Sequence, residues 1–229
     1  MIYLPVAMGA VFLVLFIITC KDKRSVEGVF LKNVVSIFFI MTAIQGVMKN
    51  SEHYRYGLVI IAGLVFGMLG DIYLDQKWVY PDDKKQYLYA GFMAFGFGHL
   101  FYISAMTKMA ELELKYLLIP LAVGIIVAVG NLLLEKPMKQ NFGEYKVIVT
   151  IYGFILSFMA ATAVMCAILT GKTAFIVFAA GGVLFLISDL ILSPMYFGEG
   201  KNTPINFILN HVTYYAGQYL IALTAYYMD

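Results

Sequence analysis

The chain has 229 residues, of which 62% are hydrophobic and 13% are charged, and its formal net charge is +2 at pH 7. Soluble domains carry about 25% charged residues, so this composition excludes a soluble globular protein and indicates a polytopic membrane protein. The positive charges are scattered through short loops, which argues against a basic surface for nucleic acid.

Eight apolar segments of about 20 residues follow one another along the chain, which is the length needed to cross a bilayer. Backbone polar groups in lipid must be paired within the segment, so segments of this length are expected to be helices. We therefore predict an all-α integral membrane protein that forms a single polytopic domain over residues 1–229. The predicted spans cover residues 2–20, 27–48, 57–76, 87–107, 115–134, 145–170, 173–194 and 205–227.

The first apolar segment lacks the basic front and small-residue cleavage site of a signal peptide, so we interpret it as a span. Cys20 and Cys166 lie in or at the end of apolar segments, where they are expected to pack as small hydrophobic residues. All six prolines lie in loops or near span ends, so no span is expected to be broken in its middle.

Lys and Arg residues are distributed unequally over the two ends of the predicted spans. One side has ten of them and the other side has five. Cytoplasmic loops of membrane proteins are enriched in these residues, so we expect the ten-charge side in the cytoplasm and both termini outside. The short, plain loops favour a bacterial inner membrane. The ten residues are Lys21, Lys23, Arg24, Lys77, Lys84, Lys85, Lys136, Lys139, Lys146 and Lys201.

The third and seventh spans each contain an aspartate near the cytoplasmic end, Asp71 and Asp189, in similar local sequences. Residues 62–75 read AGLVFGMLGDIYLD and residues 180–193 read AGGVLFLISDLILS. A carboxylate in hydrocarbon is costly and is a functional-site hypothesis by default. The simpler interpretation is a helix cap or a pair with a loop lysine, which we expect for Asp75. Two aspartates in matching contexts predict one buried site with two carboxylates.

The similarity extends to the following spans, which contain His99-x-x-Tyr102 and His211-x-x-Tyr214. This pattern indicates two parallel four-helix repeats around a central polar cavity, arising by duplication or by convergence. Gly63 and Gly67, and Ala94 and Gly98, have the small-x-x-x-small spacing of close helix contacts.

Several further polar residues are expected in the cytoplasmic half of the membrane. Lys32 either extends its ammonium to the membrane surface or binds a phosphate, and both interpretations stay open. Tyrosines in membrane helices usually pack or lie at the interface, and a serine can bond to its own helix. Asn210 and His211 are expected near the interface, with a smaller role. The supporting candidates are Lys32, His99, Tyr102, Tyr152, Ser188, Tyr215 and Gln218.

Four motifs occur in an order and spacing that resemble the YhhN-like lysoplasmalogenase family over nearly the whole chain. That family tends to have Lys-Pro in its second span, whereas Asn33 follows Lys32 here, which puts a helix kink at this point in doubt. The motifs are G-D-x-x-L at 70–74, F-x-x-G-H-x-x-Y at 95–102, S-D-x-x-L at 188–192 and T-Y-Y-x-x-Q at 213–218.

This resemblance implies an eight-span membrane hydrolase whose substrate is a lysoplasmalogen held among membrane lipids. It would cleave the sn-1 vinyl ether of 1-alkenyl glycerophosphocholine or glycerophosphoethanolamine to a fatty aldehyde and the glycerophospho-headgroup. The two essential acids of the family would correspond to Asp71 and Asp189. The resemblance implies no metal and no organic cofactor.

The chemistry of a vinyl ether suits two buried carboxyl groups. Protonation of the β-carbon gives an oxocarbenium ion, so the enzyme needs a carboxylic acid that keeps its proton near neutral pH, a condition that burial favours. A second, ionised carboxylate stabilises the cation and orients water, as in glycosidases. The sequence favours Asp189 slightly as the acid, because its neighbours are mostly apolar. His99, Tyr102 and Tyr215 would orient carboxylates or water, and Lys32 would meet the phosphate.

Three other functions remain open from the sequence. A proton-coupled transporter also uses buried carboxylates and parallel repeats, although unbroken spans argue mildly against it. A zinc-dependent lipid hydrolase needs about three His, Cys or carboxylate ligands. The chain has only three histidines, and His53 lies on the side opposite the aspartates, which argues against a zinc site. The third alternative is a lipid-binding protein without catalysis.

Overall fold

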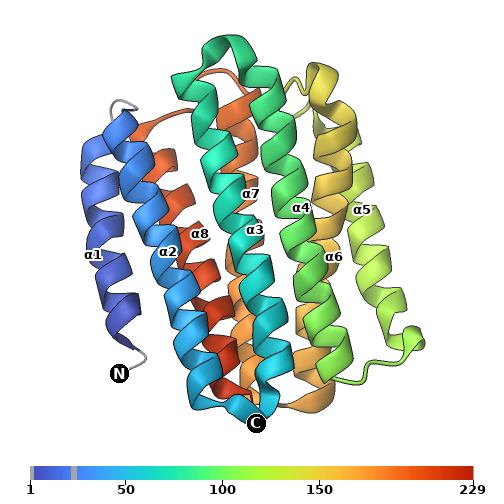
Figure 1. Cartoon of the computed structure of the whole chain (residues 1–229). Helices are drawn as coiled ribbons and strands as arrows, with labels where there is room; N and C mark the ends of the chain where they lie inside the picture. The colour runs from blue at the N-terminus through green and yellow to red at the C-terminus, as the bar shows by residue number, and fades with distance from the viewer. Residues whose placement is uncertain (1–2, 22–24, 229) are drawn as a thin grey trace.

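Eight long α-helices account for most of residues 3–21 and 25–228, which are the residues that the computed structural model describes (Figure 1). The predicted all-α fold with eight membrane-length helices is confirmed. The helices are α1 (Tyr3–Cys20), α2 (Val26–Lys49), α3 (Tyr54–Val79), α4 (Lys84–Met109), α5 (Leu118–Leu134), α6 (Lys146–Thr170), α7 (Thr173–Phe197) and α8 (Pro204–Tyr227).

Helix ends differ from the predicted span ends where a helix continues beyond its apolar part. Helices α3 and α4 each extend about one turn further toward their connection at residues 80–83. These extra turns contain charged residues, so they lie outside the apolar segments from which the spans were predicted. Helix α7 continues through Pro194 into its last turn and ends at Phe197. No proline interrupts the middle of a described helix, as predicted, because the others lie in first turns or in connections.

Helix α8 differs from the other seven in composition and in position. Seven helices are long and apolar enough to cross a membrane by length and hydropathy, whereas α8 is not among them. Its polar residues, which include Asn210, His211 and Gln218, are buried because α8 packs against α7, α2 and α3. Helices α1 and α5 lie at opposite edges of the bundle and pack mainly on α2 and α6 (Figure 1).

The packing of the first four helices recurs in the last four. Helix α1 packs on α2, α2 on α3 and α3 on α4, just as α5 packs on α6, α6 on α7 and α7 on α8. The two halves join through equivalent pairs, because α2 contacts α8 and α6 contacts α4. This arrangement matches the two parallel repeats that the aspartate motifs indicate. The two His-x-x-Tyr motifs are not equivalent in these repeats, because His99 is the sixteenth residue of α4 and His211 is the eighth residue of α8.

Equivalent glycines bring the backbones close in each half. A Cβ atom at Gly98 on α4 would lie 3.0 Å from the Gly63 carbonyl oxygen on α3. A Cβ atom at Gly217 on α8 would lie 2.8 Å from the Gly181 carbonyl oxygen on α7. The close helix contact that the small-x-x-x-small spacing indicates therefore occurs between α3 and α4, and a similar contact occurs between α7 and α8.

Replacing Gly217 by alanine is expected to destabilise the protein by about 2 kcal/mol, because the new methyl group must push the α7 backbone away. The measurement is thermal unfolding of the purified protein in detergent. Gly130 on α5 is the matched control, since a Cβ atom there meets nothing within 4 Å. A Gly217→Ala variant as stable as Gly130→Ala would show that this backbone contact is unimportant.

Helix α1 begins and α8 ends at the same end of the bundle (Figure 1). The connections at residues 80–83, 135–145 and 198–203 lie at the opposite end, and Asp71 and Asp189 lie in that half of their helices. The helices have the length and composition of an integral multi-pass membrane protein. The assignment of the connection end to the cytoplasm remains a prediction from the distribution of Lys and Arg.

Candidate active site

Both aspartates line one cavity between α2, α3, α4, α6, α7 and α8. Its volume is about 40 Å³, which suffices for about three water molecules. Apolar and aromatic side chains form the rest of the wall. The polar lining residues are Lys32, Asp71, Asp75, Tyr152, Ser188, Asp189, Asn210, His211 and Tyr214.

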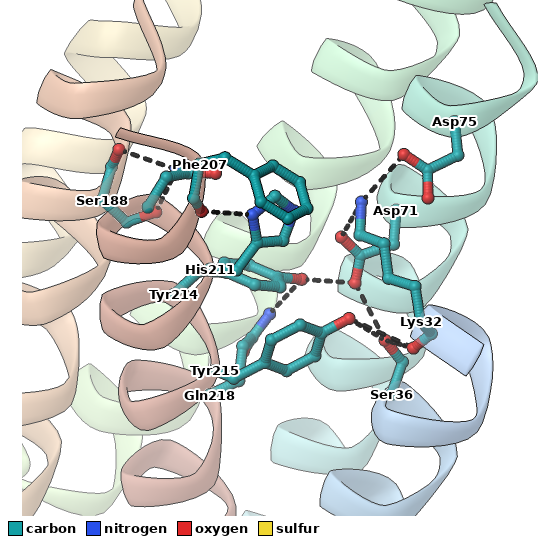
Figure 2. A network of polar contacts seen from close by, with 11 residues as sticks. Lys32, Ser36, Asp71, Asp75, Ser188, Phe207, His211, Tyr214, Tyr215 and Gln218 are labelled. Carbon is teal, nitrogen blue, oxygen red and sulfur yellow. Dashed lines mark hydrogen bonds and ion pairs between the residues drawn. The ribbon is translucent and has the colours of Figure 1, made fainter. Parts of the chain in front are cut away.

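Asp71 lies in a dense network of charges and hydroxyl groups (Figure 2). The Lys32 Nζ atom is 3.2 Å from Asp71 Oδ1 and 3.2 Å from Asp75 Oδ1. Ser36 and Tyr214 both donate hydrogen bonds to Asp71 Oδ2, at 2.9 and 2.7 Å. A cation and two hydroxyl donors therefore surround the carboxyl group of Asp71, a residue that is only 2% exposed, and they favour its ionised form.

A second layer of polar side chains holds this network in place without lining the cavity. The Tyr215 hydroxyl donates to the Lys32 carbonyl oxygen at 3.1 Å. Gln218 donates to the Tyr214 hydroxyl at 3.2 Å and accepts from the Tyr102 hydroxyl at 3.0 Å. Each of these groups is buried. Their role here is to fix the orientation of the residues that contact Asp71.

Asp189 has a simpler environment. Its carboxyl group accepts a hydrogen bond from the Tyr152 hydroxyl, and His99 Nε2 lies 3.5 Å from the same hydroxyl. Among the described residues, no Lys or Arg forms an ion pair with Asp189. The buried His99 Nδ1 has no hydrogen-bond partner within the described part of the chain. The two aspartates therefore share a cavity but differ in the charge beside them.

Ser188, Asn210 and His211 form the remaining polar wall. The Asn210 amide donates to the Ser188 hydroxyl and carbonyl oxygens, both at 2.9 Å, and His211 Nδ1 lies 2.8 Å from the Phe207 carbonyl oxygen. Asn210 and His211, which were expected near the membrane interface with a smaller role, are both buried within the protein and line the cavity. The inward face of α8, packed on α7 and α2, accounts for this position.

The structure brings all nine predicted site residues into two connected layers. Five line the cavity: Lys32, Asp71, Tyr152, Ser188 and Asp189. Four lie behind them: His99, Tyr102, Tyr215 and Gln218.

Sequence reasoning missed three residues of the Asp71 network, namely Ser36, Asp75 and Tyr214. Asp75 was expected to pair with a loop lysine, but it pairs with Lys32 inside the second helix. A usable signal existed, since Asp75 and Ser36 lie four residues after Asp71 and Lys32, and this spacing places side chains on one helix face. Within residues 3–21 and 25–228, no group of three or more His, Cys, Asp or Glu is placed to hold a metal ion.

Comparison with known proteins yields one match. The family model described as the YhhN family matches residues 28–225, a range that includes every residue of the cavity. No curated protein and no solved structure matches the chain.

Proposed function

The chain belongs to the YhhN family, and from this membership and its two-carboxylate cavity we propose that it is a lysoplasmalogenase. It hydrolyses the sn-1 vinyl ether of 1-alkenyl glycerophosphocholine or glycerophosphoethanolamine to a fatty aldehyde and the glycerophospho-headgroup. The observation that supports this best is the contrast between Asp71, which is paired with Lys32, and Asp189, which accepts a hydrogen bond from Tyr152.

This contrast supports different roles for the two carboxyl groups in the proposed reaction. Asp71 is the ionised partner, because Lys32 and two hydroxyl donors stabilise its negative charge. Asp189 is the acid, since a carboxyl group in an apolar site without a cation keeps its proton more readily. Tyr152 holds one oxygen of Asp189, which leaves the other oxygen for the substrate.

Asp189 donates its proton to the β-carbon of the vinyl ether, and the double-bond electrons form the new C–H bond. Positive charge develops on the ether oxygen and the adjacent carbon, where the Asp71 carboxylate stabilises it. Water from the cavity adds to that carbon and returns a proton to Asp189. The resulting hemiacetal transfers its hydroxyl proton to the glycerol oxygen, and the C–O bond breaks. One water is consumed, and both carboxyl groups return to their starting forms.

A second cavity, of about 70 Å³, adjoins the first at Asp189 and lies between α4, α5, α6 and α7. Asp189 and Tyr152 line both cavities, and most other lining residues are apolar, such as Leu156, Leu186 and Leu190. We assign the first carbons of the alkenyl chain to this second cavity. The rest of the chain would follow the apolar faces of α5 and α6, much of whose surface is exposed.

Aldehyde release from 1-alkenyl lysophosphatidylethanolamine by the purified protein in detergent tests the proposal. We expect equal amounts of aldehyde and glycerophosphoethanolamine, no effect of a metal chelator, and no fatty acid from the 1-acyl lipid. An Asp71→Asn variant should release no detectable aldehyde. Absence of aldehyde from a folded wild-type sample would reject the proposal, and proton-coupled solute uptake into liposomes would then favour a transporter.

A further inference from the structure

Lys32 is poorly suited to bind the headgroup phosphate, although its position in a membrane helix allows that interpretation. Its ammonium already contacts two carboxylates, Asp71 and Asp75, each at 3.2 Å. With both ionised, the cluster has a formal charge of −1 and repels a phosphate. The cavity beside it holds about three water molecules, which is too little room for a phosphodiester.

A larger cavity lies at the connection end of the bundle, between the ends of α3, α4 and α7 and the loop that precedes α6. Its volume is about 380 Å³, within the range of cavities that hold small ligands. Lys77, Lys84, Asn141 and Asn202 line it, and we call it the basic cavity.

The two lysines of the basic cavity have different environments. Lys77 is only 4% exposed, and its ammonium lies 3.1 Å from the centroid of the Tyr196 ring, whereas Lys84 is exposed. Glu144 also lines the basic cavity, but it forms an ion pair with Lys85. The basic cavity therefore has two cations within its own wall, one of them in a protected position.

The basic cavity adjoins the two-carboxylate cavity, since Trp78 and Tyr196 line both. Lys77 follows Asp71 by six residues in α3, which is about 9 Å along the helix axis. In a lysophospholipid, five bonds separate the sn-1 ether oxygen from phosphorus, or about 6 Å when extended. A phosphate–ammonium contact adds about 4 Å, so a lysophospholipid is long enough to reach from the two-carboxylate cavity to the level of Lys77.

We propose that the basic cavity binds the substrate's headgroup phosphate through Lys77 and Lys84, while its vinyl ether lies beside Asp189. The ammonium of the headgroup faces the aromatic ring of Tyr145, which also lines the basic cavity. Only the identity of the reacting bond rests on the proposed function, because the phosphate site is argued from the lysines.

Two lipids that differ only in the phosphate headgroup test this proposal: 1-alkenyl lysophosphatidylethanolamine and 1-alkenyl glycerol. Lys77→Met is expected to lower kcat/KM for the phospholipid about 10-fold or more, because a charge-assisted contact is lost, and to lower 1-alkenyl glycerol turnover much less. Lys84→Met, at an exposed position that cannot disturb packing, should lower kcat/KM for the phospholipid about 3-fold. Lys136→Met is the matched control, since Lys136 is exposed at the same end but outside the basic cavity.

Binding gives a readout that is independent of catalysis. Trp78 is the single tryptophan of the chain and lines the basic cavity, so its fluorescence reports occupancy. We expect a saturable change with 1-alkyl lysophosphatidylcholine, an ether lipid that resists hydrolysis, and at least 10-fold weaker binding in Lys77→Met. Inorganic phosphate that binds more tightly than the lipid would overturn the lipid assignment.

The outcomes separate this proposal from the proposed function. Lysine-dependent lipid binding without any vinyl ether cleavage by the wild type would support the phosphate site and reject the lysoplasmalogenase activity. Equal losses for 1-alkenyl glycerol and the phospholipid would overturn the phosphate site. The phosphate site would also be overturned if both Lys77→Met and Lys84→Met bound and turned over the phospholipid like the wild type.

Discussion

Replacement of Asp189 by asparagine is expected to lower kcat for vinyl ether hydrolysis about 1,000-fold, with little change in KM. Asparagine keeps the shape of the side chain, and its carbonyl oxygen still accepts the hydrogen bond from Tyr152. It has no acidic proton to transfer to carbon, and proton transfer is the step that forms the cation. Steady-state aldehyde release from 1-alkenyl lysophosphatidylethanolamine measures the effect.

Asp83→Asn is the matched control for this variant, because Asp83 is an exposed aspartate in the short connection between α3 and α4. It should retain wild-type kcat and KM. The thermal unfolding midpoint of Asp189→Asn should stay close to that of the wild type. More than one tenth of wild-type kcat in Asp189→Asn would exclude this residue as the proton donor.

Replacement of Lys32 by methionine is expected to destabilise the protein by about 3 kcal/mol. Lys32 is the cation between Asp71 and Asp75, and its side chain is 7% exposed while that of Asp71 is 3% exposed. Its removal leaves two neighbouring carboxylates without a compensating charge in a buried site. Thermal unfolding in detergent, followed by the fluorescence of Trp78, measures the loss.

A second substitution shows whether charge causes the effect. In Lys32→Met/Asp75→Asn the cluster regains its original net charge, so most of the lost stability should return. Lys49→Met, at the exposed end of the same helix, should unfold like the wild type. A double variant no more stable than Lys32→Met would assign the loss to packing instead of to electrostatics.

The fold could be predicted from the sequence because the length of apolar segments determines how many helices cross a bilayer. The predicted ends agree with the helices to within three residues, and the differences include residues 76–87, where charged residues continue α3 and α4 beyond the apolar part, and the end of α7 at Phe197. The buried position of Asn210 and His211 could not be predicted from hydropathy, because polarity lowers the hydropathy of α8 whether it faces lipid or protein.

The candidate site was predictable where a polar residue is costly in lipid, which applies to Asp71, Asp189 and Lys32. Which partner each one contacts depends on how the helices are rotated about their axes. A linear sequence does not specify that rotation between distant helices, so the pairing of Lys32 with Asp75 was missed.

The two repeats differ at one pair of equivalent positions that contact the aspartates. Lys32 is the seventh residue of α2, and Tyr152 is the seventh residue of α6. Each contacts the aspartate of the next helix, but one is a cation and the other a hydroxyl donor. Equivalent positions in similar halves thus give the two carboxyl groups unequal surroundings.

The low hydropathy of α8 has a consequence for biogenesis. Of the eight helices, α8 leaves the ribosome last. It is less apolar than the other seven helices, whose hydropathy is high enough for insertion into a membrane. Its polar side chains find their partners on α2, α3, α4 and α7, which are already in the membrane. Because Tyr214, Tyr215 and Gln218 all come from α8, the polar network around Asp71 is incomplete until this helix docks.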